Sequence, residues 1–464
     1  MAILSGFMKM PCNNRETFLE KIRARTTPDK ARFISDSDYS FSLSMLNVVN
    51  RLYKGPTEYS GRNVMIRTHG QFATALAALA LDGVARRILL CPADIPDAQI
   101  PRLMQDGEAE LILTDADIDM KIGIAIEGDI VALPRFDTEW VLFTSGTSGL
   151  PKLVLHSFAS LTGHLGDGLS PDQPVWGTFY DIRRYGGLQI LLRALTGAGS
   201  MVLSRADEQI HDFITRLGSM GVTHISGTPS HWRRVLMSGV AEKMNPSYIR
   251  LSGEIAGQDI LDCLHSAYPQ AKIGHAYAST EAGVAFSVDD GQAGFPQSVP
   301  NAVAPRPNIR IVDGTLRVRS SAMASRYLGA TAPTLVDADG YVDTGDIVEQ
   351  RGDRYIFIGR REGVVNVGGL KVHPEEVEAT INLHPAVAMS RVWGQPSPIT
   401  GALIAADVVL TPKIDGIERD FSDIRQQIIA ACRTALAPHK VPVRLIEVSE
   451  IPVMTSGKIE RHHA

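Results

Sequence analysis

A glycine- and hydroxyl-rich segment is the part of the sequence best suited to chemistry. It reads TSGTSGLPK from Thr144 to Lys152 and follows an apolar run, WVLF. Small residues let backbone N–H groups turn inward on an anion, while hydroxyls add donors and lysine adds positive charge. The sequence therefore predicts a polyphosphate-binding loop, with the residues Thr144, Ser145, Gly146, Thr147, Ser148, Gly149 and Lys152.

This loop differs from a Walker A motif, in which lysine directly follows glycine and a helix comes next. Here Pro151 precedes the lysine, and the following KLVLH alternates like a strand. A P-loop NTPase or kinase, which would release phosphate or ADP, is therefore disfavoured. For the loop taken alone, an ordinary Ser/Gly/Thr turn is the competing interpretation.

Short apolar segments alternate with helical ones from Gly61 onwards, and they must position this loop. Strands are expected at 63–67, 86–92, 222–227, 248–254 and 272–279, with a helix at 71–83. Such alternation indicates a largely parallel sheet, in which ligands bind beyond the carboxyl ends of the strands. Residues 1–60 are only weakly patterned.

Turns and short strands dominate after about residue 300, and a smaller segment begins at Glu362. The predicted fold class is therefore α/β. A large N-terminal domain, residues 1–361, is expected to hold mixed or parallel sheets with flanking helices. A small α+β C-terminal domain is expected over residues 362–464.

Composition narrows the class of protein. The chain has 464 residues, of which 44% are hydrophobic and 21% charged, as in ordinary globular proteins. Lysine and arginine number 46 against 51 acidic residues, a net charge of −5, so no basic excess indicates nucleic acid or a membrane surface. Four scattered cysteines without a C-x-x-C pair fit a reducing compartment. With no signal peptide recognised, we expect a cytoplasmic enzyme or binding protein.

Together with the loop, four further segments resemble the adenylate-forming superfamily, which comprises acyl- and aryl-CoA synthetases, adenylation domains and luciferases. In HAYASTEAG (275–283), the resemblance implies that Tyr277 stacks on adenine, Thr280 contacts the α-phosphate and Glu281 binds Mg²⁺. An aromatic face suits a purine, and a carboxylate oxygen suits Mg²⁺. In YVDTGDI (341–347), it implies that Asp346 binds the ribose hydroxyls.

The remaining motifs concern the C-terminal part and the substrate pocket. IGRREGVVNVGGLKVHPEEVE (358–378) resembles the segment that opens a mobile C-terminal domain. LAPHKVPVRLIEVSEIPVMTSGKIER (436–461), which includes TSGK, resembles the family's C-terminal signature. SGEIAG (252–257) resembles the segment around adenine, while 225–232 and 179–198 resemble walls of the acyl pocket. The implied residues are Arg360 at ribose or phosphate, Glu362 at the hinge, Gly368 and Gly369 in the thiol tunnel, Lys371 as a nucleotide contact, Lys458 as the adenylation lysine, and Gly253 and Glu254 near adenine.

The resemblance implies a two-step ligase. A small carboxylic acid would attack ATP with Mg²⁺, forming an acyl-adenylate and pyrophosphate, and Lys458 would stabilise the developing charge. The C-terminal domain would then rotate about Glu362, so that CoA forms an acyl-CoA and AMP leaves. The sequence indicates no oligomeric state.

Several alternatives stay open. The acceptor could be the phosphopantetheine of an acyl or peptidyl carrier protein, and the protein could be a stand-alone amino-acid adenylation enzyme. Asp181 could bind an α-amine, but Arg183 and Arg184 beside it favour a non-amino acid unless they face solvent. A binding protein without activity is disfavoured by the intact Lys458 and Asp346.

Overall fold

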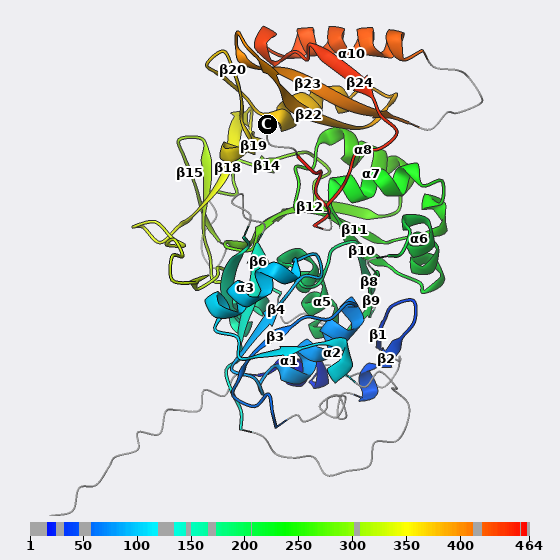
Figure 1. Ribbon diagram of the computed structural model, residues 1–464. Coiled ribbons are helices and arrows are strands. Elements are labelled where there is room, and N and C mark those ends of the chain that lie inside the picture. Colours follow the sequence, from blue (N-terminus) through cyan, green and yellow to red (C-terminus); the bar gives the residue numbers. More distant parts are fainter. Residues whose placement is uncertain are drawn as a thin grey trace, which may run out of the picture.

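The computed structural model is an α/β protein with a large body and a smaller C-terminal body, as the predicted fold class required. In Figure 1 the orange and red C-terminal body lies above the large one. The structure describes residues 16–24, 32–45, 57–118, 134–144, 150–165, 173–205, 207–300, 307–411, 420–454 and 456–461. Within these ranges, no helix combines the length and the apolar character needed to cross a membrane.

A six-stranded sheet carries the predicted phosphate loop, in the order β17-β7-β6-β4-β3-β5. Its β3, β4, β5 and β6 run parallel, whereas β7 is antiparallel to both β6 and β17. The strands are β3 (Asn63–Ile66), β4 (Arg87–Leu90), β5 (Leu111–Leu113), β6 (Glu139–Thr144), β7 (Lys152–Ser157) and β17 (Arg326–Leu328).

An eight-stranded sheet lies beside it, in the order β13-β12-β11-β10-β8-β9-β1-β2. The strands from β12 to β1 are parallel, and the two edge strands are antiparallel to their neighbours. They are β1 (Phe33–Ser35), β2 (Ser40–Ser42), β8 (Val175–Thr178), β9 (Ser200–Val202), β10 (His224–Gly227), β11 (Tyr248–Leu251), β12 (Lys272–Ser279) and β13 (Gly283–Val288).

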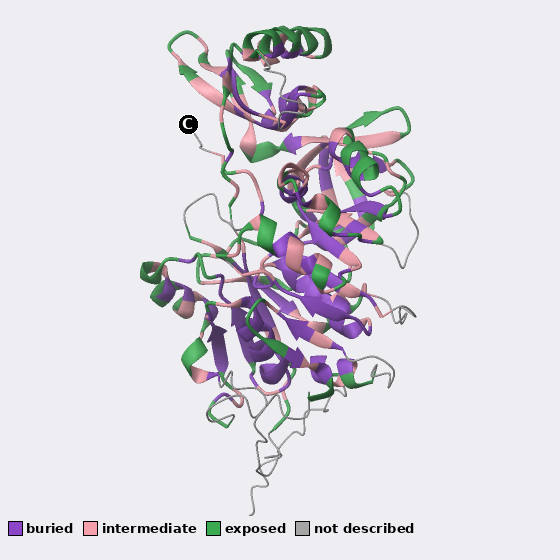
Figure 2. Ribbon diagram, turned by 90° about the vertical axis from the view of Figure 1, so that its right-hand side faces the viewer, coloured by how far each residue is buried: buried purple, intermediate pink, exposed green. Residues whose placement is uncertain are grey.

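Helices fill the space between these sheets and cover the outer face of the larger one. Apolar residues of α2, α5 and both sheets form one hydrophobic core, while α6, α7 and α8 form another on the opposite face of the eight-stranded sheet. Figure 2 shows the resulting concentration of buried residues in the large body. The helices are α1 (Phe18–Arg23), α2 (Gln71–Leu81), α3 (Ile100–Gly107), α4 (Phe158–Thr162), α5 (Tyr185–Thr196), α6 (Ile210–Ser219), α7 (Pro229–Met237) and α8 (Gln258–Ala267).

A five-stranded antiparallel sheet and the C-terminal body follow along the chain. The five-stranded order is β14-β19-β18-β16-β15, and the C-terminal body has the sheets β20-β21 and β22-β23-β24 with α9 and α10. The elements are β14 (Phe295–Pro296), β15 (Asn308–Val312), β16 (Thr315–Arg319), β18 (Val342–Arg351), β19 (Arg354–Arg360), β20 (Val365–Val367), β21 (Leu370–Val372), α9 (Pro374–Asn382), β22 (Val387–Ser397), β23 (Gly401–Leu410), α10 (Phe421–Ala435) and β24 (Arg444–Glu447).

The weakly patterned N-terminal region contributes more structure than its sequence indicates. Within 16–45 the chain forms α1 and the hairpin β1–β2, which extends the eight-stranded sheet through β9. Strands of three residues are too short to show a clear alternation of apolar and polar side chains. They are stabilised by pairing with a neighbouring strand, and a local sequence pattern does not reveal that pairing.

Candidate functional site

The predicted phosphate loop connects two antiparallel strands. Thr144 at the end of β6 pairs with Lys152 at the start of β7, so the loop leaves and re-enters one sheet, as its sequence predicts. Ser145, Gly146, Thr147, Ser148 and Gly149 lie outside the described residues. The ammonium of Lys152 lies 5.5 Å from the ring centroid of Tyr327, a cation–π contact.

Tyr327 connects the loop to the carboxylate predicted to bind Mg²⁺. It stands on β17, opposite Val154 of β7, and its hydroxyl donates to Glu281 Oε1 at 3.1 Å. Burial and the nearby Glu281 raise the pKa of Tyr327, so the hydroxyl stays protonated as a donor. Sequence reasoning missed Tyr327, because a lone tyrosine after the core motifs gives no signal without the β17–β7 pairing.

The second carboxylate oxygen of Glu281 has no hydrogen-bond partner among the described residues. A single protein carboxylate fits Mg²⁺, which is typically bound by one or two carboxylates together with substrate phosphates and water. No group of three or more His, Cys, Asp or Glu side chains that could hold a metal occurs in the described ranges. The site therefore suits a metal that arrives with a nucleotide.

A buried histidine fixes the turn that carries Thr280 and Glu281. His156 on β7 donates from Nε2 to the Thr280 carbonyl at 2.8 Å, and its Nδ1 lies 3.1 Å from the Ser160 hydroxyl. Burial lowers the pKa of His156 to about 4, so the ring is neutral at physiological pH. Sequence reasoning also missed His156, although it lies in the strand that directly follows the loop.

Three residues predicted to bind the nucleoside lie in contact. The Tyr277 hydroxyl donates to the Asp346 carboxylate, and Arg360 Nε lies 3.3 Å from the other carboxylate oxygen. The strands β18 and β19 impose the second contact, because Asp346 and Arg360 are directly paired. The Tyr277 ring stacks on Phe357 at 5.3 Å and Phe286 at 5.5 Å, so part of its surface is already packed.

The C-terminal signature enters the large body and brings Lys458 into the same site. Burial and Arg360 lower the pKa of Lys458, whereas the nearby Glu254, Asp346 and Glu281 act in the opposite direction. In Figure 1 the red segment runs down from the upper body toward α7 and β12. Residues more than a hundred positions apart thus converge on one ammonium group.

Glu254, which the resemblance places near adenine, also contacts the C-terminal signature. Its Oε1 accepts from the backbone N–H of Ile459 at 3.0 Å, and its Oε2 accepts from that of Ser230 at 2.9 Å. The Thr228 hydroxyl also donates to the Gly457 carbonyl at 2.6 Å. Glu254 therefore holds the Lys458 segment against α7.

The residues predicted for the thiol step lie elsewhere in this structure. Glu362 lies in a single helical turn after β19, and Gly368 and Gly369 form the β20–β21 turn with φ of +60° and +87°. Lys371 is exposed on β21. In this structure Lys458, and not the β20–β21 hairpin, lies beside the residues predicted to bind the nucleotide.

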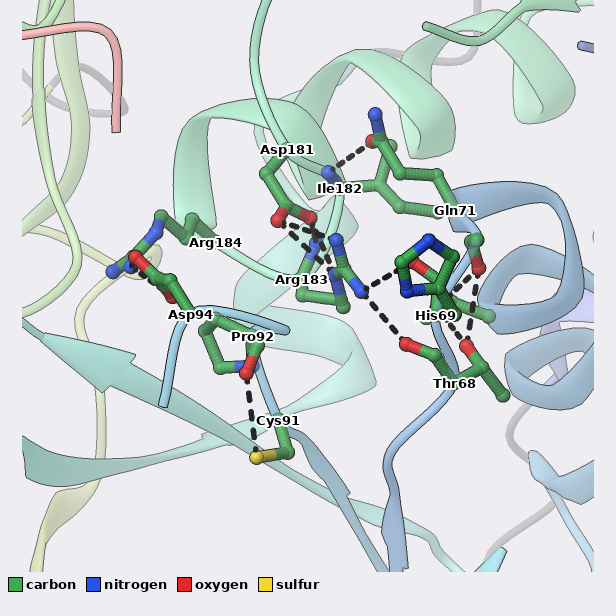
Figure 3. A network of polar contacts seen from close by, with 12 residues as sticks. Thr68, His69, Gln71, Cys91, Pro92, Asp94, Asp181, Ile182, Arg183 and Arg184 are labelled. Atoms are coloured by element: carbon green, nitrogen blue, oxygen red, sulfur yellow. Dashed lines mark hydrogen bonds and ion pairs between the residues drawn. The ribbon is translucent and has the colours of Figure 1, made fainter. Parts of the chain in front are cut away.

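The polar loop after β8 is closed by internal ion pairs, which Figure 3 shows. Arg183 is 3% exposed and binds both oxygens of Asp181 at 2.8 Å, while it also donates to the Thr68 carbonyl at 2.8 Å. Arg184 pairs with Asp94 at 2.6 Å. Arg183 and Arg184 therefore form ion pairs within the protein and do not both face solvent. The Asp181 carboxylate is bound by the guanidinium group of Arg183.

Fold and site together define a two-body nucleotide-dependent ligase with a lysine supplied by its C-terminal segment. The family model described as AMP-binding enzyme matches residues 110–327, and the AMP-binding enzyme C-terminal domain matches residues 376–458. The chain belongs to the adenylate-forming superfamily of AMP-binding enzymes.

Relatives in sequence are CoA ligases. The human mitochondrial acyl-coenzyme A synthetase ACSM5 is 24% identical over 447 residues, covering 90% of this chain and 76% of that protein. The 2-succinylbenzoate–CoA ligase of Bacillus velezensis is 27% identical, covering 78% of this chain and 76% of that protein.

Solved structures share the fold at low sequence identity. An anthranilate CoA ligase in complex with anthranoyl-AMP superimposes with a TM-score of 0.77 at 17% identity, covering 96% of this chain and 95% of the other. The o-succinylbenzoate CoA synthetase of Bacillus subtilis gives a TM-score of 0.68 at 17% identity, covering 95% and 96%.

Proposed function

We propose that the protein is an AMP-forming acid–thiol ligase, which converts a carboxylic acid and ATP to an acyl-adenylate and then to an acyl-CoA. The observation that carries this proposal is the convergence of Lys458, Glu281 and Asp346 on one partly buried site. Membership of the family and the CoA ligases among its relatives support ATP and CoA as co-substrates.

In the first step, a carboxylate oxygen of the acid attacks the α-phosphorus of ATP, and pyrophosphate leaves with the bonding electrons. Lys458 and the phosphate loop stabilise the negative charge that develops on the phosphoryl oxygens. Asp346 accepts hydrogen bonds from the ribose, with Arg360 beside it. His156 and Tyr327 hold Thr280 and Glu281 in position. Bound Mg²⁺ would be held by Glu281 and would supply charge neutralisation at the phosphates.

In the second step, a thiol attacks the acyl carbon and AMP leaves. The C-terminal domain, proposed as residues 362–464, turns about Glu362, so that Lys458 withdraws and the 368–371 hairpin replaces it. Two separate places for Lys458 and Lys371 in one structure support this alternation, because both cannot serve one site at once. Glu362→Pro should therefore leave pyrophosphate exchange intact and block thioester formation.

The acid is proposed to be a non-amino organic acid, because the Asp181 carboxylate is paired with Arg183 and is not free for an ammonium group. CoA is preferred to a carrier protein as acceptor. Buried Cys91 and Cys432 and exposed Cys263 are all unbonded, which supports a cytoplasmic location.

The decisive test is acid-dependent release of AMP and pyrophosphate over a panel of carboxylic acids, with and without CoA. We expect pyrophosphate exchange without CoA, and stoichiometric AMP and acyl-CoA once CoA is added. Exchange with amino acids alone, or none with any acid, would overturn the proposal. Release of ADP would indicate a kinase-like reaction.

A further inference from the structure

A polar stripe runs along the otherwise apolar helix α5, which lies in the core between the two large sheets. Tyr185, Gln189 and Arg193 are spaced four residues apart, so their side chains lie on one face of the helix. The remaining side chains are mostly buried leucine, isoleucine and alanine. Polar residues in such a helix require partners, because burying unpaired polar groups is costly.

Arg250 on β11 approaches this stripe from the sheet. Its neighbours Ile249 and Leu251 belong to the core formed with α7 and α8 on the opposite face. Because side chains alternate along a strand, Arg250 points to the face that α5 covers. Burial and the nearby Arg250 lower the pKa of Arg193 to about 10, so the two guanidinium groups are within electrostatic reach.

Among the described residues, neither the Arg193 nor the Arg250 side chain has a hydrogen-bonding or ion-pairing partner, and both residues are partly buried. Two buried arginines elsewhere in the chain have a carboxylate partner: Arg87 pairs with Glu139 at 2.6 Å, and Arg183 with Asp181 at 2.8 Å. Two neighbouring buried cations without a counter-ion are unfavourable, and removal of one partner from a buried ion pair is known to be strongly destabilising. Within the described residues, the cluster therefore contains no carboxylate.

Two further side chains in this cluster have unused hydrogen-bonding capacity. The His164 ring lies beside the Gln189 side chain, but neither its ring nitrogens nor the Gln189 Oε1 makes a hydrogen bond of good geometry, while the Gln189 amide donates to the Leu161 carbonyl at 3.1 Å. Burial, with the two nearby arginines, lowers the pKa of His164 to about 4, so the ring is neutral. Buried polar atoms are normally satisfied by protein or by a bound molecule, which indicates space for a polar ligand group.

The cluster lies along α5, whose sequence resembles a wall of the acyl pocket, and the helix connects it to the adenylation site. The Tyr185 ring is 5.6 Å from that of His156, which holds the Thr280 carbonyl of the adenylation site. Arg193 is eight residues further along α5, or roughly 12 Å. Arg250 pairs in register with Gly274, which is three residues, or roughly 10 Å, before Tyr277 on β12.

We propose that Arg193 and Arg250 bind a second carboxylate, so that the enzyme activates a dicarboxylic acid at one end and holds the other end in this cluster. The inference rests on the proposed function and specifies its substrate class. A guanidinium fork matches a carboxylate in two parallel hydrogen bonds, and His164 and Gln189 can complete the shell. The span of roughly 10 Å favours a medium-length acid over malonate or succinate.

The test compares suberate with octanoate and monomethyl suberate, which have the same carbon backbone but one free carboxylate. We expect kcat/KM for pyrophosphate exchange to be at least tenfold higher with suberate in the unaltered protein. Arg193→Met and Arg250→Met should each remove this preference by raising the KM for suberate, with the KM for ATP unchanged. Arg351→Met, on the exposed β18–β19 turn, is the matched control and should retain the preference.

Exchange measurements on the unaltered protein are enough to overturn the proposal. Equal or better exchange with octanoate or monomethyl suberate than with any dicarboxylate would exclude a second carboxylate site while leaving the ligase function intact. Calorimetric titration of suberate without ATP separates the two questions. Binding that Arg193→Met weakens tenfold supports the cluster even if exchange fails, whereas no binding together with monocarboxylate exchange contradicts it.

Discussion

Gly457 lies directly against the imidazole of His231, so that a Cβ at position 457 would overlap the ring. Its φ of +79° also lies in the left-handed region, which side chains other than glycine adopt at a cost. His231 is fixed by its Nδ1 contact with Thr228 and by stacking on Phe179 at 5.4 Å. The residue before Lys458 therefore sets how deeply the lysine enters the site.

Gly457→Ala should lower pyrophosphate exchange by roughly 10- to 100-fold, because strained backbone costs about 1–3 kcal/mol and the ring overlap adds to it. Thiolysis of supplied acyl-adenylate should be nearly unchanged, since that step does not need Lys458 in place. Gly352→Ala is the matched control, because Gly352 also has a positive φ but open space around it. Equal loss of both half-reactions in Gly457→Ala would contradict this role.

Lys458→Ala should abolish pyrophosphate exchange and largely spare thiolysis of acyl-adenylate. The partly buried ammonium lies near Glu281 and Asp346, where its charge is placed for the first half-reaction only. The two half-reactions are measured separately, with ³²P-pyrophosphate and with synthetic acyl-adenylate plus CoA. A variant that loses both equally would argue against two conformations.

Tyr327→Phe should raise the Mg²⁺ concentration needed for half-maximal exchange several-fold. The change removes the hydroxyl that bonds Glu281 but keeps the ring beneath Lys152. A lost hydrogen bond to a charged group is worth about 1.5–3 kcal/mol, although a metal-bound carboxylate recovers part of it. Tyr39→Phe, an exposed position, serves as the control. An unchanged Mg²⁺ titration would show that the contact has no part in positioning Glu281.

Acid should destabilise the protein through its buried histidines. Burial lowers the pKa of His156 to about 4 and that of His231 to about 3, from 6.5. Below pH 6.5 the two imidazole rings become protonated in the unfolded chain but stay neutral in the folded chain. The free energy of unfolding therefore falls as pH decreases toward 4. Each histidine contributes on the order of 3 kcal/mol over this range.

Urea unfolding between pH 7.5 and 4.5 measures this dependence. His156→Gln should reduce its slope, even if the variant is less stable at pH 7.5. His211→Gln, on the exposed surface of α6, should leave the slope unchanged. If His156→Gln does not alter the slope, this ring takes up its proton at the same pH in the folded and the unfolded chain, and its pKa is not lowered by folding.

Local patterns in the sequence determined the fold class and the strand–loop–strand context of the phosphate loop, whereas the grouping of Tyr277, Asp346 and Lys458 was implied by the resemblance to the adenylate-forming superfamily. These features are readable because apolar periodicity specifies strands and helices, and because chemical motifs occupy contiguous residues. Only the tertiary structure assigned Glu254 to Ile459, Tyr327 to Glu281 and His156 to Thr280. These contacts join residues 46 to 205 positions apart. The same holds for Arg193 and Arg250, which a helix face and a strand face bring together with no carboxylate partner among the described residues.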